Sequence, residues 1–188
     1  MGFTVIIAAY KNIGMIKRAI ESVYNQEYRH FEILVCSDGD DLNIRRVVDD
    51  YEDPRIKYHF VEFEGECGYR SQNEMTQIAE NDLIIYLDQD NIIYKNCFFR
   101  VLEEWEEGLG LLIYRINHGI GVIPKGEEIE HRNIDTLNGV VQTSIAKRCK
   151  MENIKPSGDS RFYKQVEQIC KDEGYKVKFI KDILGVHN

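Results

Sequence analysis

The chain has 188 residues, of which 43% are hydrophobic and 30% are charged, and its formal net charge is −8. This length and composition predict one sizeable core, and the acidic balance without a basic stripe argues against a nucleic-acid-binding protein. No apolar run is long enough to span a bilayer, and residues 1–10 lack the basic region and cleavage site of a signal peptide.

The first half of the chain alternates predicted strands with predicted helices. Runs of β-branched and apolar residues predict the strands, and apolar residues at helical spacing predict the helices. Ser71, with Glu74 three residues later, is predicted to cap the third helix. In chain order these elements are strand 3–10, helix 15–25, strand 31–37, helix 42–51, strand 56–63, helix 71–80 and strand 82–87.

This alternation predicts an α/β fold with a mostly parallel sheet that is covered by helices on both faces. In such sheets ligands bind beyond the carboxyl ends of the strands. Asp38 and Asp40 follow the second predicted strand, and Asp88 and Asp90 follow the fourth. Both acidic pairs are therefore expected at the functional edge of the sheet.

The second half is less regular and predicts a small additional β region. A polar segment at 125–133 is predicted to be a mobile loop that serves as an acceptor-side flap. The remaining predicted elements are helix 96–107, strand 111–117 with its hairpin partner 119–124, helices 144–150 and 160–173, and strand 176–180. Because no repeat or linker interrupts the chain, we predict a single domain over 1–188, which is either complete or part of a longer protein.

The spacing of Asp88 and Asp90 points to a cation. A single carboxylate at the end of a strand is often only a polar residue that meets water, but two carboxylates so close together repel each other. Their repulsion either raises a pKa or requires a positive ion. Since Mg²⁺ and Mn²⁺ commonly bind carboxylates together with substrate phosphates, this spacing predicts a metal held between the protein and a diphosphate.

Four segments, taken in order, resemble the family 2 glycosyltransferases, which have the GT-A fold. They are "TVIIAAYKN", "EILVCSDGDD", "GYRSQNEMTQIAENDLIIYLDQD" and "GDSRFYKQV", and the resemblance extends from Phe3 to His187. The resemblance implies transfer of a sugar from a nucleoside-diphosphate sugar, with UDP as the expected nucleotide, to a glycan, lipid or protein acceptor. It also implies a nucleotide-binding half at 1–90 and an acceptor and catalytic-base half at 91–188.

The resemblance assigns the metal and catalytic residues. Asp88 would support the ribose and the metal shell, and Asp90 would be the direct ligand of Mn²⁺ or Mg²⁺. His187 falls where some GT-A enzymes place a further metal ligand, although a disordered tail is the alternative for this residue. Asp159 matches the catalytic base, and a helix cap is its alternative.

The resemblance also assigns contacts to the donor nucleotide. Ala8 and Tyr10 match the turn that lies against the nucleotide, and Asp38 matches the residue that hydrogen-bonds uracil. Asn73 matches the family's Arg-Asn pair only in its second position. Arg70 would then reach the diphosphate instead, since a guanidinium pairs well with phosphate oxygens. A turn residue is the alternative for Asp38, and a surface side chain is the alternative for Arg70.

Three readings of function follow. The first is a metal-dependent, inverting glycosyltransferase, because one carboxylate base and direct displacement invert the anomeric centre. The second is a nucleotidyltransferase, although the Gly-rich basic loop of that class is not found after the first strand. The third is a non-catalytic sugar-binding module derived from a GT-A enzyme.

Five cysteines are spread widely along the chain, and no CxxC pair occurs. The pattern argues against a zinc site and favours a reducing compartment, so we predict a cytoplasmic protein. Cys36 and Cys97 lie in apolar surroundings and are predicted to be small buried hydrophobic residues.

Overall fold

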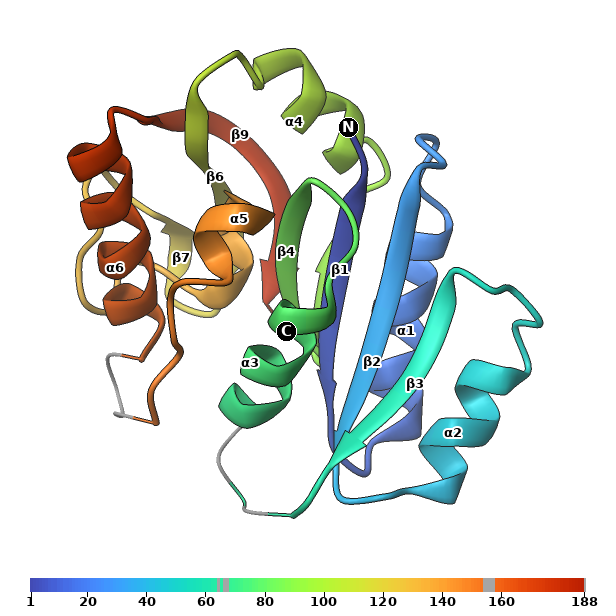
Figure 1. Cartoon of the computed structure of the whole chain (residues 1–188). Coiled ribbons are helices and arrows are strands. Elements are labelled where there is room, and N and C mark those ends of the chain that lie inside the picture. Colours follow the sequence, from blue (N-terminus) through green and yellow to red (C-terminus); the bar gives the residue numbers. More distant parts are fainter. Residues whose placement is uncertain (64, 66–67, 154–157, 188) are drawn as a thin grey trace.

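The computed structural model describes residues 1–63, 65, 68–153 and 158–187. Within these residues nine strands form one sheet in the order β3-β2-β1-β4-β8-β6-β9-β5, and β7 pairs with β6 (Figure 1). A single sheet therefore runs through both halves of the chain.

The first half forms the parallel part of the sheet, as predicted. β1 pairs with β2 and β4, and β2 pairs with β3, all in parallel. The elements of this half are β1 (Phe3–Ala9), α1 (Ile13–Tyr24), β2 (Phe31–Asp38), α2 (Leu42–Asp49), β3 (Ile56–Val61), α3 (Tyr69–Ile78) and β4 (Leu83–Asp88).

The second half adds mainly antiparallel pairs. β8 pairs antiparallel with β4 and β6, β5 pairs antiparallel with β9, and β6 with β7 forms the predicted hairpin. The elements of this half are β5 (Asn91–Ile93), α4 (Cys97–Glu104), β6 (Leu109–His118), β7 (Gly121–Ile123), the 3₁₀ helix η1 (Thr136–Asn138), β8 (Gly139–Gln142), α5 (Thr143–Ala146), α6 (Gly158–Glu173) and β9 (Lys176–His187).

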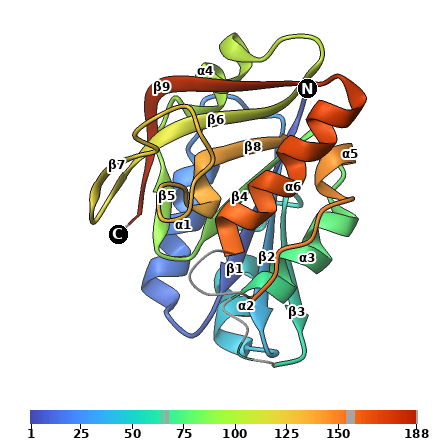
Figure 2. The same ribbon diagram turned by 90° about the vertical axis from the view of Figure 1, so that its left-hand side faces the viewer.

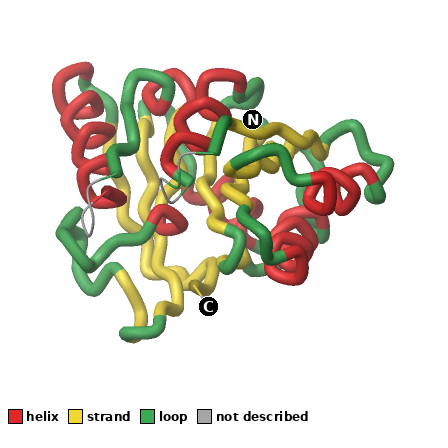
Figure 3. The backbone as a smooth tube through the Cα atoms, turned by 90° about the horizontal axis from the view of Figure 1, so that it is seen from below, coloured by secondary structure: helices red, strands yellow, loops and turns green. Residues whose placement is uncertain are grey.

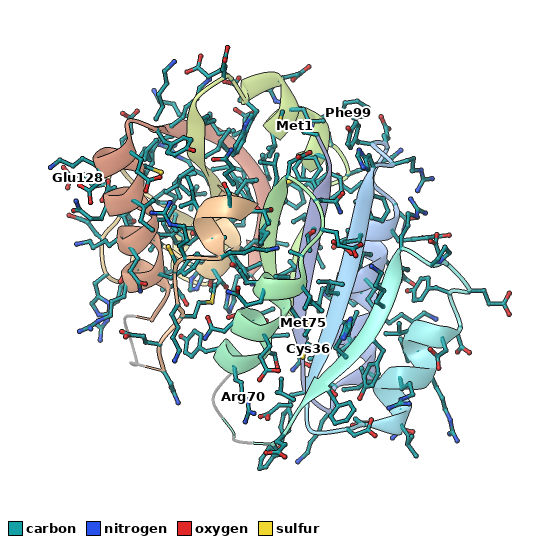
Figure 4. All side chains as sticks on the ribbon, in the orientation of Figure 1. Met1, Cys36, Arg70, Met75, Phe99 and Glu128 are labelled. Atoms are coloured by element: carbon teal, nitrogen blue, oxygen red, sulfur yellow. The ribbon has the colours of Figure 1, made fainter. Side chains whose placement is uncertain are left out.

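Helices cover both faces of the sheet because its strands are apolar on both sides. On one face α1, α2 and α4 pack in a core with Val5 and Ile7 of β1. On the other face α3, α5 and α6 pack in a second core with Ile6. Viewed from below, the strands form a curved layer with helices on either side (Figure 3). Cys36 of β2 and Met75 of α3 lie near each other in the second core (Figure 4).

The last strand is much longer than predicted. β9 runs beside β6 in parallel and then bends toward the C-terminus (Figure 2). The pairing register shifts while β6 passes from Ile113 to Ile116, and β9 passes from Phe179 to Gly185 over the same stretch. Asp182 and Gly185 interrupt the apolar pattern, so the sequence predicted an end at Ile180.

Local capping differs from the prediction in α3. Gly68, with a φ of 83°, occupies the N-cap position, whereas Ser71 lies inside the helix and is buried. Glu74 instead pairs with Arg70 one turn earlier, with 2.9 Å between Nε and Oε1. By contrast Asp41 caps α2 by accepting hydrogen bonds from the backbone N–H groups of Asn43 and Ile44.

The polar segment at 125–133 lies outside helices and strands, as predicted, but it is tied to the fold. Ile129 is buried in the second core, and the Asn133 side chain accepts a hydrogen bond from the Lys125 backbone at 2.9 Å. Its role as an acceptor-side flap stays a prediction. Among the described residues no helix combines the length and the apolar character needed to cross a membrane.

Candidate active site

A pocket of about 480 Å³ opens where the parallel strands end. β1, β2 and β4 deliver their last residues to the same edge because they run in the same direction. The pocket is lined by Ala8, Ala9, Tyr10, Asp38, Phe63, Gly65, Gly68, Asp88, Gln89, Asp90 and His187. Six of the residues assigned from the sequence therefore meet here, namely Ala8, Tyr10, Asp38, Asp88, Asp90 and His187.

Asp88 is held by two neutral side chains at the end of β4. Gln72 donates from Nε2 to Oδ1 at 3.0 Å, and Thr136 donates from Oγ1 to Oδ2 at 3.2 Å. Burial raises the pKa of Asp88 to about 8. Nearby carboxylates act in the same direction, in the order Asp135, Asp159 and Asp90. A site in which one carboxyl group keeps its proton to limit repulsion is suited to a cation.

Asp159 lies in the first turn of α6, close to this group. The Tyr69 hydroxyl donates to its Oδ1 at 3.5 Å. Burial, and then the negative charge of Asp135, raise the pKa of Asp159 to about 7, while Tyr69 and His187 act against this shift. The N-cap position of α6 falls outside the described residues. Asp159 is therefore a carboxyl group that can take up a proton near neutral pH.

His187 is not a tail residue. It is the last residue of β9, where it pairs with Asn91 of β5, and it lines the pocket. Its Nδ1 lies 2.9 Å from Oδ2 of Asp135. This hydrogen bond is the main reason that the pKa of His187 is raised, with smaller contributions from the charges of Asp135, Asp90 and Asp88. The long final strand is thus what brings the imidazole to the acidic group.

The other end of the pocket carries aromatic and small residues. Tyr10 and Phe63 stack with 6.1 Å between ring centroids, and Phe63 is largely exposed. Asp38 accepts a hydrogen bond from the Gly65 backbone at 3.1 Å. Ala8 lies beside Asp88 in the sheet register, and a Cβ added to Gly68 would come within 2.8 Å of its methyl group. Small residues therefore keep the middle of the pocket open.

Two assigned residues lie elsewhere. Arg70 lies near the start of α3 (Figure 4). It is ion-paired with Glu74. The Asn73 amide is used by the backbone of Met151, since it donates to the carbonyl at 2.9 Å and accepts from the N–H at 2.8 Å. This pair of bonds fastens α3 to the segment after α5. Donor contacts by Arg70 and Asn73 stay predictions.

Sequence reasoning missed four polar residues of the site. Gln72 and Thr136 hold Asp88, Asp135 holds His187, and Gln89 accepts a hydrogen bond from the Tyr10 backbone at 2.7 Å. The place of Gln72, where the family usually has Arg, was a signal for one of them. Asp135 and Thr136 gave none, because they are the cap and the first residue of a short 3₁₀ helix without apolar periodicity.

Comparison with known proteins places the chain in a family. Residues 4–177 match the family model described as glycosyl transferase family 2. The chain belongs to glycosyl transferase family 2. It is 30% identical over 148 residues to an uncharacterized glycosyltransferase of Rickettsia conorii. The matched region covers 78% of this chain and 24% of that protein.

A second family 2 relative has a more specific name. It is UDP-Glc:alpha-D-GlcNAc-diphosphoundecaprenol beta-1,3-glucosyltransferase WfgD of Escherichia coli, to which the chain is 34% identical over 94 residues. The matched region covers 50% of this chain and 36% of that protein. The chain therefore spans 24% of the length of the Rickettsia protein and 36% of the Escherichia coli protein.

Solved structures confirm the α/β GT-A fold predicted for this family 2 chain. TarS 1–349 of S. aureus superimposes with a TM-score of 0.81 at 17% identity, over 100% of this chain and 60% of that chain. The structure of TarS 1–349 in complex with UDP-GlcNAc superimposes with a TM-score of 0.80 at 17% identity, over 99% of this chain and 58% of that chain. The mannosyltransferase PcManGT of Pyrobaculum calidifontis, in complex with GDP-Man and Mn²⁺, superimposes with a TM-score of 0.74 at 14% identity. This match covers 98% of this chain and 56% of that chain.

Proposed function

We propose that this chain is the donor-binding and catalytic domain of a metal-dependent, inverting glycosyltransferase that uses a UDP-sugar. The observation that carries the proposal is the pocket on the carboxyl edge of the sheet, which Asp88, Asp90 and His187 line together. Asp159 lies close enough for its charge to raise the pKa of Asp88. Enzymes that transfer a sugar from a nucleoside diphosphate need a counter-charge for the leaving group and a base for the acceptor, and this group of side chains offers both.

The donor set fits Mg²⁺ or Mn²⁺. Asp88 and Asp90 supply the carboxylate oxygens that such ions prefer, and His187 supplies an imidazole nitrogen that favours Mn²⁺ of the two. The raised pKa of Asp88 reflects burial first and then repulsion from nearby carboxylates, and a cation would relieve that repulsion. A bound ion would neutralise the charge that grows on the leaving diphosphate.

The nucleotide would occupy the end of the pocket near Asp38. The Asp38 carboxylate can accept a hydrogen bond from the uracil N3–H, and the Gly65 N–H lies beside it. Tyr10 and Phe63 provide exposed aromatic surface for the base. The printed names of TarS complexed with UDP-GlcNAc and of the UDP-Glc-dependent relative support UDP as the nucleotide.

Asp159 would act as the catalytic base. As the acceptor oxygen forms its bond to the anomeric carbon, the bond from that carbon to the diphosphate breaks and the hydroxyl proton passes to Asp159. A base with a pKa near the working pH combines a useful fraction of the ionised form with adequate basicity. A single displacement from the face opposite the leaving group inverts the configuration of the anomeric carbon.

The acceptor is proposed to be lipid-linked. Two relatives are named for acceptors carried on undecaprenol diphosphate, one from Escherichia coli and one from Campylobacter jejuni. Because this chain spans only 36% and 35% of those proteins, acceptor-binding parts can lie outside it. A glycan or protein acceptor uses the same hydroxyl chemistry.

A thermal-shift experiment tests the proposal. With Mn²⁺ present, UDP at 100 times its Kd should stabilise the chain by about 2.7 kcal/mol, or about 5–10 °C at this size, whereas ADP should not. Asp90→Ala should abolish the shift, and Asp49→Ala, an exposed carboxylate on α2, should keep it. An equal response to UDP and ADP would contradict the proposal.

Product analysis separates the alternatives. A glycosyltransferase releases UDP from the sugar donor in the presence of acceptor or, slowly, of water. Release of pyrophosphate from a nucleoside triphosphate would identify a nucleotidyltransferase. Binding of UDP-sugar without any release, with and without Mn²⁺, would identify a sugar-binding module.

A further inference from the structure

Asp135 is the buried partner of the pocket histidine. Its Oδ2 lies 2.9 Å from Nδ1 of His187, and only 7% of the residue is exposed. His187 itself lines the pocket with Asp88 and Asp90. The imidazole therefore stands between a buried carboxylate on one side and the proposed ion site on the other.

The carboxylate of Asp135 is fixed in place by its other contacts. The backbone N–H of Leu137 donates to Oδ1 at 2.9 Å, and the Asn91 amide donates to the same oxygen at 3.4 Å. Asp135 thereby caps η1, and its own N–H is bound by the Asn138 side chain at 2.7 Å. Since neutral donors occupy Oδ1, Oδ2 is the oxygen presented to His187.

We propose that Asp135 is a positioning residue, which holds Nδ1 of His187 and so directs Nε2 to the divalent ion between Asp88 and Asp90. The inference rests on the proposed function. Histidine ligands commonly donate their second ring N–H to a carboxylate, which fixes the ring orientation and increases the basicity of the coordinating nitrogen. Because Nδ1 is already engaged, Nε2 is the nitrogen that remains for coordination.

The neighbouring residue extends this role to the first carboxylate. Thr136 directly follows Asp135 in the chain, and its hydroxyl donates to Oδ2 of Asp88 at 3.2 Å. One capped turn of 3₁₀ helix thus orients ligands that come from two different strands, Asp88 at the end of β4 and His187 at the end of β9. The geometry of the ion site depends on η1.

A direct chelate by the same cluster is the competing arrangement. One ligand atom from each of His118, Asp135 and His187 lies within 4.8 Å of the others, and the two imidazole rings are 4.5 Å apart. However, the 2.9 Å between Asp135 and His187 is a hydrogen-bond distance, and Nδ1 of His118 accepts from the Ile120 N–H at 3.4 Å. We therefore expect one ion per chain, with His118 packed against the ring that holds it.

Asp135→Asn is the test, because it alters one hydrogen bond and keeps the rest. The donors from Leu137 and Asn91 require the amide oxygen to take the place of Oδ1, so the amide NH₂ must face His187. That NH₂ donates to Nδ1, which moves the ring proton to Nε2 and blocks coordination. In the presence of UDP, the Kd for Mn²⁺, measured from the free Mn²⁺ signal in electron paramagnetic resonance, should rise about 10–100-fold.

Matched variants separate positioning from general damage. Asp53→Asn removes another poorly exposed carboxylate, which lies before β3 and pairs with Arg55, and it should leave the Kd for Mn²⁺ unchanged. In a His187→Ala background, Asp135→Asn should add no further loss. A loss of the same size in that background would show that Asp135 acts only on the fold, and this would overturn the inference.

The remaining outcomes are also decisive. Nitrogen-15 spectra of the Mg²⁺ complex should show His187 protonated at Nδ1 in the unmodified chain and at Nε2 in Asp135→Asn. The positioning role of Asp135 would be contradicted if Asp135→Asn left the Mn²⁺ affinity unchanged. It would also be contradicted if the chain bound two ions and His118→Ala removed one of them. Neither result would contradict the proposed metal dependence. Absence of Mn²⁺ binding in the unmodified chain with UDP would instead contradict the metal dependence in the proposed function.

Discussion

Asp159 is buried and has negatively charged neighbours, and both raise its pKa to about 7. The Tyr69 hydroxyl is its hydrogen-bond donor, and Asp135 contributes the strongest repulsion. A carboxyl group in such surroundings is a stronger base than an exposed one. This environment, rather than the first-turn position of the residue, supports the catalytic assignment, since an exposed Asp would stabilise the helix equally well.

Asp159→Asn should keep donor binding and lose transfer. The amide preserves size and the contact with Tyr69, but it cannot accept the acceptor proton, so kcat should fall by about 10²–10⁴-fold. Thermal shifts with UDP and Mn²⁺ should stay at the level of the unmodified chain. Asp172→Asn, near the other end of α6, serves as the control. Turnover at the normal rate in Asp159→Asn would exclude it as the base.

Part of the candidate site could be predicted from single residues. The spacing of Asp88 and Asp90 after an apolar run was enough to predict an acidic pair at the sheet edge, and the structure brings both to the pocket. Asp135 could not be predicted, because its partner lies 52 residues away on a strand whose extent the sequence concealed. Asn73 matched the family by position, yet its amide is used by a neighbouring backbone segment.

At the scale of elements, α2 offers a direct measure of capping beside the pocket. Asp41 accepts hydrogen bonds from the Asn43 and Ile44 N–H groups at 2.8 and 3.3 Å. Asp40, one residue earlier, is exposed and pairs with Arg45 at 3.0 Å. The two carboxylates are adjacent in sequence but serve different purposes, one in a helix cap and one in a surface ion pair.

Asp41→Ala should lower the free energy of unfolding by about 1 kcal/mol, because two backbone donors lose their acceptor. At this chain length the loss corresponds to a fall in Tm of about 2–4 °C. Asp40→Ala is the matched control, with a change within about 0.5 kcal/mol. Denaturant unfolding of both variants measures the difference, and equal losses would show that the cap contributes no more than the ion pair.

The elements that the sequence predicted well are those with long, regular apolar patterns. β1, β2 and β4 and the helices between them have such patterns because both faces of the parallel sheet are buried. β5 and β8 are only three and four residues long, so they carry too few residues to establish a period. The Ser71 cap was wrong, because Gly68, three residues earlier, adopts the left-handed backbone conformation and occupies the N-cap position of α3.

At the scale of the whole molecule, the site costs stability when no cation is bound. The pKa of Asp88 is about 8 in the fold against 3.8 for the free side chain. A group whose pKa is raised by folding stabilises the folded state when it is protonated, and that stability declines as pH rises toward the folded pKa. The ion-free protein should therefore lose stability between about pH 4 and pH 8.

Asp88→Asn should remove the part of this pH dependence that Asp88 contributes, and it should abolish Mn²⁺ binding. The amide can still accept from Gln72 and donate to Thr136, and it carries no charge at any pH. With EDTA present, its Tm should exceed that of the unmodified chain by at least about 2–4 °C at pH 8.5, and by less at pH 6. Asp49→Asn should show no such trend, and a gain that is equal at the two pH values would contradict the assignment.

The irregular stretch of β9 decides which side chain reaches the pocket. In the register of its first part, where Ile113 pairs with Phe179, the residue beside His118 would be Leu184. The slip before Gly185 brings Val186 opposite Asn117, so that His187 arrives instead. Insertions or deletions at 180–184 would therefore shift this register and bring a side chain other than His187 to the pocket. The number of residues in this irregular stretch therefore determines the lining of the pocket as much as the identities of its acidic residues do.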